Sequence, residues 1–269
     1  MAKVEPAALD SVLASALAGD AGPLTGFLKD HSNLPGPRGN LELAGQLADA
    51  LAVLAPGERS EAAWRVVVGL AGVGAAEAPT GDPGEFLAFC GTVAAGGFAP
   101  DPGRSEAVWE VLHRAAEDER WRLREGAAQG IQRALPADPT GALATLGKWA
   151  ASGSWLLCRA AAAGLADPPL LQDPRVASAA LRLHETILAR VTGASDRKTP
   201  DFRVLRQGLG YSLSVVVAAT PEPGFALLRR LAAVADPDLA WVLRSNLAKG
   251  RLTRTHARET EAVLARLAG

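Results

Sequence analysis

Trp121-Arg-Leu-Arg-Glu-Gly-Ala-Ala-Gln-Gly-Ile131 is the stretch that decides the fold, because its pattern returns along the chain. It aligns without gaps on 155–165, on 202–212 and on 241–251, and a fainter copy begins at Phe86. Each copy has an aromatic residue first, an apolar residue third and small residues where a helix would make close contact. Copies that return after 34 to 47 residues are typical of stacked helical pairs. The repeat therefore predicts an all-α fold.

Composition agrees with a helical protein. The chain has 269 residues and is 48% hydrophobic, which is enough for a sizeable core. It contains no uncharged apolar run of about 18 residues, so we expect no transmembrane span and no membrane partner. The N-terminal sequence MAKVEPAALD lacks the basic and apolar regions of a signal peptide. We interpret Cys90 and Cys158 as buried free thiols of a cytoplasmic protein, with a disulfide as the alternative.

The charges of the chain are unevenly distributed. Residues 1–100 contain 5 Lys and Arg against 11 Asp and Glu, whereas residues 101–269 contain 23 against 18. A basic C-terminal part suggests that the later repeats meet an anion. The alternative is that charge varies by chance along a solvated helical array.

Prolines and glycines divide the chain into predicted helices. Asn40 and Ser60 are predicted N-caps, and the turn-rich stretch 74–84 is either a linker or a turn within one array. We predict a single domain over 1–269, with divergent repeats in 1–84, regular repeats in 85–252 and a capping helix in 253–269. The predicted helices are 6–19, 23–31, 41–54, 61–73, 105–116, 121–135, 140–151, 155–166, 174–191, 202–219, 223–235, 239–252 and 255–267.

Two copies carry a family resemblance. Asp118-Glu-Arg-Trp121-Arg-Leu-Arg124 and Asp238-Leu-Ala-Trp241-Val-Leu-Arg244 share the form Asp-x-x-Trp-x-x-Arg, which resembles the turn and second helix of HEAT repeats. The resemblance implies a right-handed α-solenoid of about six antiparallel helix pairs. It also implies that Arg124 and Arg244 have structural roles at the turns, where a guanidinium binds carboxylates and backbone carbonyls.

A second resemblance concerns Trp149-Ala-Ala-Ser-Gly-Ser-Trp155-Leu-Leu-Cys-Arg-Ala-Ala161. This segment is similar to the Trp-x-x-Ser-x-x-Trp-x-x-Arg-Arg pattern of the DNA-alkylation-repeat glycosylases, a branch of the HEAT-like proteins. Their catalytic Asp lies in a Trp-Trp-Asp-Thr-Val-Asp segment, which this chain lacks. The resemblance implies a relative that contacts nucleic acid without glycosylase chemistry.

The histidines, cysteines and glycines are not spaced as catalytic, metal or phosphate-binding sites require. The histidines are far apart in sequence, and Leu188 stands where a zinc-protease helix beginning His184-Glu185 would need its second histidine. Neither cysteine has a partner at metal-binding spacing. Gly208 and Gly210 lie within a predicted helix rather than in a phosphate-binding loop. We therefore predict no catalytic residue, no metal and no cofactor.

The repeat also predicts a binding surface. In each copy we expect the aromatic residue and positions +2, +6 and +10 to face the stack, so that positions +1, +4 and +8 point away from it. In HEAT-like arrays the second helices line a groove, which predicts a non-enzymatic module that binds a protein or peptide partner there. The alternative partner is nucleic acid. The alternative to a binding surface is that the arginines at these positions are ordinary solvated side chains, some of them paired with acids such as Asp201. The groove cations would be Arg122, Arg159, Arg203, Arg206 and Lys249, opposed by Glu125.

Overall fold

The computed structural model describes residues 6–267, and helices account for its regular structure. Helix makes up 72% of it, and the described residues form no strand. The all-α prediction is confirmed. Residues 1–5 and 268–269, at the ends of the predicted N-terminal segment and capping helix, lie outside the described residues.

The helices belong to two compact units, Met1–Asp138 (unit 1) and Pro139–Gly269 (unit 2). The division falls in the short break between two predicted helices. That both units form one continuous domain stays a prediction, as do the solenoid's handedness and its number of repeats.

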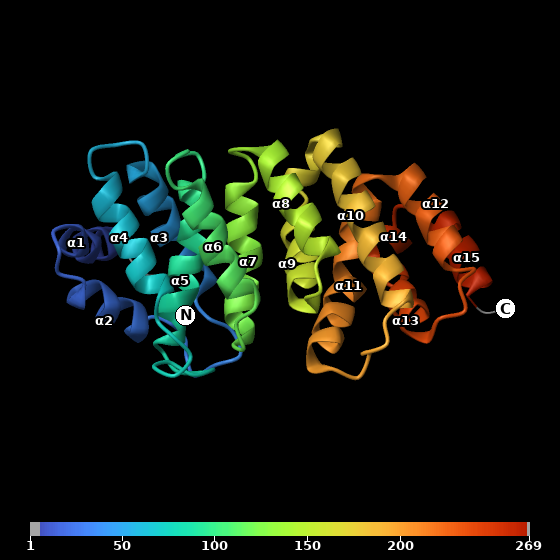
Figure 1. The fold of residues 1–269 in the computed structure, drawn as a ribbon, viewed down its shortest axis with the longest axis horizontal. Helices are drawn as coiled ribbons and strands as arrows, with labels where there is room; N and C mark the ends of the chain where they lie inside the picture. The colour runs from blue at the N-terminus through green and yellow to red at the C-terminus, as the bar shows by residue number, and fades with distance from the viewer. Residues whose placement is uncertain (1–5, 268–269) are drawn as a thin grey trace. The chain divides into compact units, whose positions relative to one another are not determined.

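Unit 1 is built around one buried helix (Figure 1). All side chains of α5 are buried, and α5 packs against α3, α4 and α7. Figure 1 shows α1 end-on, running across the other helices of this unit. The helices of unit 1 are α1 (Pro6–Leu17), α2 (Gly22–Asp30), α3 (Leu41–Leu54), α4 (Ser60–Ala71), α5 (Glu85–Ala95), the short 3-10 helix η1 (Gly96–Phe98), α6 (Ser105–Ala116) and α7 (Trp121–Ala134).

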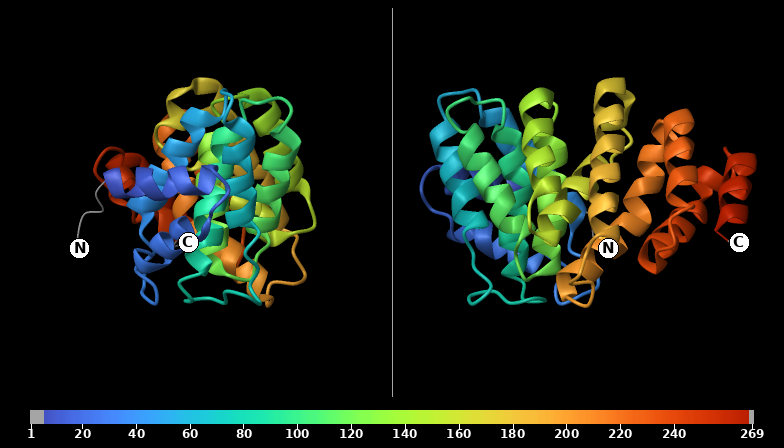
Figure 2. Two further views of the ribbon diagram at one scale, coloured as in Figure 1. Left: turned by 90° about the vertical axis from the view of Figure 1, so that its left-hand side faces the viewer. Right: turned by 45° about the vertical axis from the view of Figure 1, so that its right-hand side comes forward.

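Unit 2 has its centre at the long helix α11, which packs between α9 and α13 (Figure 2). Within each unit, alternate helices therefore lie side by side: α3, α5 and α7 in unit 1, and α9, α11 and α13 in unit 2. The helices of unit 2 are α8 (Pro139–Ala151), α9 (Trp155–Leu165), η2 (Leu170–Gln172), α10 (Pro174–Thr192), α11 (Pro200–Ala219), α12 (Pro221–Leu231), α13 (Pro237–Leu247), α14 (Gly250–Thr253) and α15 (Ala257–Arg266).

Most helix ends lie within two residues of the predicted ones, but α12, predicted over 223–235, begins two residues earlier and ends four residues earlier. Asn40 caps α3 by accepting a hydrogen bond from the backbone N–H of Leu43 at 3.1 Å, as predicted. Ser60 is the first residue of α4 rather than its cap, and its buried hydroxyl has no hydrogen-bond partner among the described residues. The helix predicted over 239–252 is interrupted, because α13 ends at Leu247 and α14 begins at Gly250.

Polar contacts between helices recur at about the spacing of the sequence repeat. An arginine or tryptophan side chain in one pair binds a group about one repeat away, as expected when each pair stacks on its neighbour. The separations are 43 residues for Arg104–Glu61, 42 for Arg120–Ala78, 40 for Arg190–Ala150, 41 for Trp155–Asp196, 41 for Arg197–Asp238, 45 for Arg230–Glu185 and 40 for Arg251–Tyr211.

The turn arginines have structural contacts. Arg124 binds its own turn, as predicted, because it donates to the backbone carbonyls of Asp118 at 2.6 Å and Glu119 at 2.9 Å. Arg244 instead donates to the carbonyl of Leu267, at the end of α15, at 2.8 Å. Cys90 and Cys158 are buried free thiols, and burial raises the pKa of both. Among the described helices, none combines the length and apolar character needed to cross a bilayer.

Candidate functional site

The exposed face of the motif differs from the predicted one. Trp121 and Trp241, the first residues of their copies, are 42% and 37% exposed, whereas Trp155 and Phe202 are buried. Position +1 was predicted to face solvent but is buried at Arg122, at Leu156 and at Val242. The first residue of the motif (position 0) lies within about 80° of positions +4 and +8 around a helix axis. In α7 and α13 this is the face that is exposed to solvent. The aligned copies therefore do not share one rotation about the helix axis.

Arg122, the predicted groove residue of unit 1, lies inside the unit. Its guanidinium forms an ion pair with the fully buried Glu85 at 3.0 Å and donates to the carbonyl of Gly36 at 2.5 Å. Glu85 also accepts a hydrogen bond from the backbone N–H of Gly81 at 2.8 Å. The charge of Arg122 is thus neutralised, and its contacts join α5, α7 and two loops.

Arg159 and Arg206, in unit 2, are held against α11 and α13. The aliphatic part of Arg159 packs on Gly208, and only 8% of Arg159 is exposed. Arg206 forms an ion pair with Asp238 at 2.9 Å, and its guanidinium carbon lies 4.1 Å from the centroid of the Trp241 ring. These side chains are positioned by packing, so they form the border of a surface rather than its free charges.

Of the remaining predicted cations, Arg203 is exposed on α11, whereas Lys249 is half-buried and lies just before α14. Arg203, Gln207 and Tyr211 occupy successive turns of one face of this helix, and all three are exposed. The Lys249 ammonium lies 5.7 Å from the centroid of the Tyr211 ring, and the Arg251 guanidinium carbon lies 4.6 Å from it. Arg251 also donates to the Tyr211 hydroxyl at 3.0 Å. We call these five residues the α11 strip.

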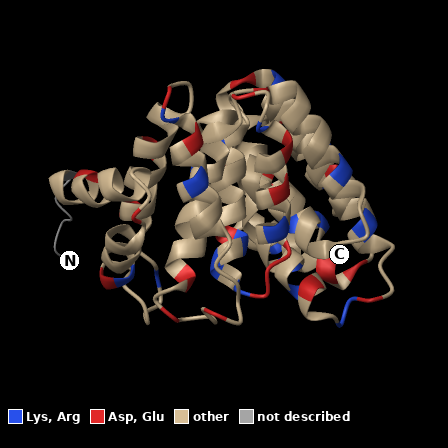
Figure 3. Cartoon of the chain, turned by 60° about the vertical axis from the view of Figure 1, so that its left-hand side comes forward, with Lys and Arg blue, Asp and Glu red and all other residues tan. Residues whose placement is uncertain are grey.

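The α11 strip has an excess of positive charge. Arg203, Lys249 and Arg251 form no ion pair with any residue between 6 and 267. Arg203 donates only to the backbone carbonyl of Lys198, at 2.8 Å. Unit 2 as a whole contains 17 Lys and Arg against 10 Asp and Glu. Figure 3 shows, however, that basic and acidic residues are interleaved along the ribbon. The strip can therefore attract an anionic group locally.

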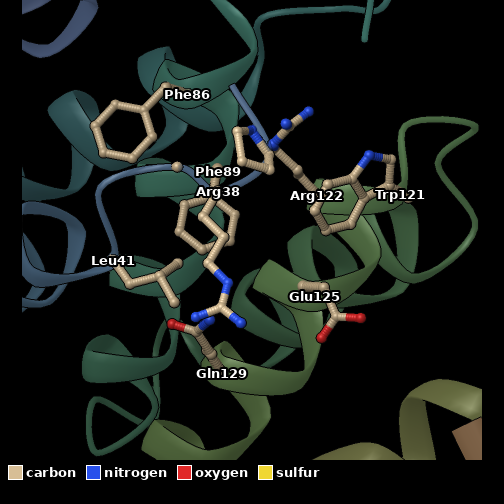
Figure 4. Close-up of a pocket in the computed structure, with 10 residues that line it drawn as sticks. Arg38, Leu41, Phe86, Phe89, Trp121, Arg122, Glu125 and Gln129 are labelled. Atoms are coloured by element: carbon tan, nitrogen blue, oxygen red, sulfur yellow. The ribbon is translucent and has the colours of Figure 1, made fainter. Parts of the chain in front are cut away.

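A separate pocket of about 280 Å³ opens on unit 1 (Figure 4). The loop before α3 and the helices α5 and α7 line it, and it includes positions 0, +4 and +8 of the first motif copy. We call it the unit 1 pocket. Its lining residues are Pro37, Arg38, Gly39, Leu41, Phe86, Phe89, Trp121, Arg122, Glu125 and Gln129.

One serine–histidine pair lies in unit 2, but solvent does not reach it. The Ser212 hydroxyl lies 2.9 Å from His184 Nε2, and His184 Nδ1 lies 2.8 Å from the carbonyl of Ala180. Both side chains are buried, and burial lowers the pKa of His184 to about 4. A substrate has no access to this pair. Within the described part of the chain, no three His, Cys, Asp or Glu side chains group in a way that suits a metal ion.

The segment that resembles the DNA-alkylation-repeat pattern serves packing. Trp149 and Trp155 are 6% and 9% exposed. The Trp155 indole N–H donates to Asp196 at 2.7 Å, and its ring meets Phe202 edge-on with centroids 5.5 Å apart. Neither tryptophan presents a ring face on which a base could stack.

The chain matches no protein-family model, and no curated protein shows significant sequence similarity to it. The site is therefore defined by its geometry. Among the residues of the α11 strip and the unit 1 pocket, sequence reasoning named Arg203, Lys249, Arg122 and Glu125, but it did not name Tyr211, Arg251 or Arg38. Tyr211 is the one tyrosine of the chain, and a polar aromatic residue among aliphatic core positions was a usable signal for it.

Proposed function

We propose that this protein is a non-enzymatic interaction module whose α11 strip binds an acidic, extended segment of a protein partner. The observation that supports this most is the grouping of Arg203, Lys249 and Arg251 along the exposed Tyr211, where none of the three has a carboxylate partner among the described residues. Charged groups that are positioned in advance bind oppositely charged groups with less loss of side-chain freedom.

The dimensions of the strip suit a short peptide segment. Arg203 and Tyr211 are eight residues apart on α11, which is about 12 Å along the helix axis. An extended peptide covers that length with about four residues. Acidic side chains near both ends of such a segment would meet Arg203 at one end and the Lys249–Arg251 pair at the other.

The rings favour carboxylate recognition over base stacking. Arg206 covers Trp241, and Lys249 and Arg251 lie over Tyr211. The groups presented to a partner are therefore mainly cations supported by rings, and cation–π contacts hold such cations in place.

We further infer that the helix pairs are HEAT-like repeats, about six in number, stacked as a right-handed solenoid. The side-by-side packing of alternate helices within each unit and the recurring polar contacts support this inference. A crystal structure showing left-handed stacking, or helices α7 and α8 packed without a repeat relation, would contradict it.

The binding proposal is tested with a fluorescent acidic peptide of ten residues and the full chain. The double variant Arg203→Glu, Lys249→Glu should weaken binding by about tenfold or more, since each reversal replaces an attraction with a repulsion. Arg182→Glu, Arg258→Glu is the matched control, because both arginines are exposed and neither forms an ion pair with a described residue. Equal losses in the two double variants would mean that only net charge matters, and the proposal would fail.

A single-stranded nucleic acid is the second candidate partner. Exposed aromatic residues beside cations are the feature that favours it, here Tyr211 with Lys249 and Arg251. A fluorescent thymidine oligonucleotide distinguishes the candidates. Tighter binding to the oligonucleotide than to the peptide, lost in the strip variant and steeply dependent on salt, would replace the peptide proposal with this one. An affinity pull-down that returns one stoichiometric protein after nuclease treatment would support the peptide proposal.

A further inference from the structure

We propose that the unit 1 pocket binds a small monocarboxylate that carries one aromatic or branched apolar group. This ligand site lies in a different unit from the α11 strip and involves none of its residues. The proposal goes beyond the interaction function, because it assigns a small-molecule or chain-terminus ligand to the protein.

The wall of the pocket is apolar and aromatic. Phe86 and Phe89 are buried, and their rings stack with centroids 6.1 Å apart and planes 15° apart. Leu41 and Trp121 form the rim, and they are 51% and 42% exposed. A large exposed leucine and tryptophan beside an aromatic wall leave apolar surface that a ligand can cover.

The pocket is held open by the contacts behind it. The ion pair between Glu85 and Arg122 and the hydrogen bond from Arg122 to Gly36 fix the loop against α5 and α7. Asn40 donates through its backbone N–H to Ser32 at 3.0 Å, which closes the same loop. The pocket is thus preorganised, which lowers the entropic cost of binding.

The arginine side chains of the pocket favour a ligand with a negative charge. Arg38 extends across it (Figure 4) and makes no hydrogen bond or ion pair with any described residue. Nε of Arg122, which is 7% exposed, is buried in the same wall without a hydrogen-bond partner. Arg38 supplies the positive charge that a carboxylate needs, and the Nε–H of Arg122, whose charge is neutralised by Glu85, can donate a hydrogen bond to the same carboxylate. Glu125 at the same pocket disfavours a second negative charge on the ligand.

The volume limits the apolar part of the ligand. About 280 Å³ lies just below the range of roughly 300–1,000 Å³ that is typical of small-molecule sites. One aromatic ring or one branched side chain with its carboxylate fills such a space. A free aromatic acid and the last residue of a peptide share this chemistry, and the experiment separates the two sources.

The experiment measures binding to the full chain by ligand-observed NMR and calorimetry. The probes are 3-phenylpropionate, its neutral analogue 3-phenylpropanol, and acetyl-Ala-Phe with either a free or an amidated C-terminus. We expect 3-phenylpropionate to bind with a Kd in about the millimolar range and at least about tenfold more tightly than the alcohol. Tighter binding of the dipeptide acid than of 3-phenylpropionate would identify a peptide C-terminus as the source, and the reverse would identify a free acid.

Matched variants assign the binding to the pocket. Arg38→Gln should weaken 3-phenylpropionate binding by about tenfold. Arg65→Gln should leave it unchanged, because Arg65 is exposed on α4 and lies outside the pocket. The strip variant Arg203→Glu, Lys249→Glu should also retain it. Equal binding of acid and alcohol, undiminished binding in Arg38→Gln with native circular dichroism, or no binding of any probe would each overturn the proposal.

Discussion

The two units use similar helix packing but bury different polar groups. Unit 1 buries a charged pair, Glu85–Arg122, and carries 11 Lys and Arg against 19 Asp and Glu. Unit 2 buries the neutral pair His184–Ser212, an amide, Asn246, and the arginine Arg159, and it has an excess of basic residues. A buried charge destabilises the fold unless its counter-charge is present, whereas a buried imidazole destabilises it once protonated. Loss of the counter-charge should therefore destabilise unit 1, and acid should destabilise unit 2.

Removal of the partner in unit 1 should have the largest effect. Glu85→Ala leaves the guanidinium of Arg122 buried without a counter-charge, and the expected cost is about 3–5 kcal/mol in the free energy of unfolding. Urea denaturation followed by circular dichroism measures the loss, and hydrogen exchange with mass spectrometry should locate it in unit 1.

Two controls sharpen this prediction. Glu110→Ala breaks the exposed pair with Arg114, whose side chains are 65% and 61% exposed, and should cost less than about 1 kcal/mol. The double variant Glu85→Leu, Arg122→Met should recover much of the stability, because it removes both charges. A Glu85→Ala protein as stable as Glu110→Ala would show that the buried pair has no special importance.

The next largest effect concerns acid and unit 2. Burial lowers the pKa of His184 to about 4, whereas an exposed histidine has a pKa of 6.5. Between these values the unfolded chain binds the proton and the folded chain does not. Stability from this group is therefore fully present above pH 6.5 and falls as the pH decreases towards 4, by about 3 kcal/mol in total.

The double variant His184→Leu, Ser212→Ala removes the titrating group together with its hydroxyl partner. Denaturation between pH 7.5 and pH 4 should show a shallower decline in stability for this variant than for the natural chain. Parallel declines in the two proteins would mean that folding does not lower the pKa of His184. Hydrogen exchange should place the acid-sensitive opening in α10 and α11, which carry the pair.

A smaller effect tests how closely the helices of unit 1 approach. A Cβ atom at Gly91 would collide with the backbone nitrogen of Ala71 and would lie 2.8 Å from the carbonyl oxygen of Val67. Gly91→Ala should therefore cost about 1–3 kcal/mol through displacement of α4 from α5. Gly69, an exposed glycine of α4, has nothing within 4 Å of such a Cβ. Gly69→Ala should instead stabilise the protein by up to about 1 kcal/mol.

The helices were predictable because their signals are local. The bounds of α6 match the predicted 105–116, and α7, α8 and α9 differ from their predictions by one residue at one end. Proline and capping residues act within a few positions, so they mark helix ends without tertiary information. The break in 239–252 was missed because Lys249-Gly250 is a weak signal within a helical pattern.

The candidate sites were harder to predict because they depend on helix rotation and on neighbours. An aligned aromatic residue lies in the core at Phe202 and on the surface at Trp241, since α11 is packed on both sides by α9 and α13. Arg122 has the same residue type as Arg203 but meets Glu85, which is 37 residues away in sequence. Such pairing is a property of the folded chain, and no single repeat encodes it.

The smallest expected effect compares a neutral cap in unit 1 with an anionic cap in unit 2. Asn40 caps α3, whereas Asp236 caps α13 and forms an ion pair with Arg197 at 2.7 Å. Burial raises the pKa of Asp236. Hydrogen bonds from Arg197 and from the backbone N–H of Leu239 lower it by more than burial raises it, so that the pKa lies below the ordinary value of 3.8. At pH 7, Asn40→Ala and Asp236→Ala should each cost about 1 kcal/mol.

Stability from an aspartate with a lowered pKa is present above its unfolded pKa and is lost as the pH falls through its folded pKa. The cost of Asp236→Ala should therefore shrink as the pH falls below 3.8, while the cost of Asn40→Ala should stay constant. The contribution of His184 cancels in each comparison, because every protein in it retains that residue. Equal pH dependence of the two costs would show that the charge of Asp236 does not contribute to the cap.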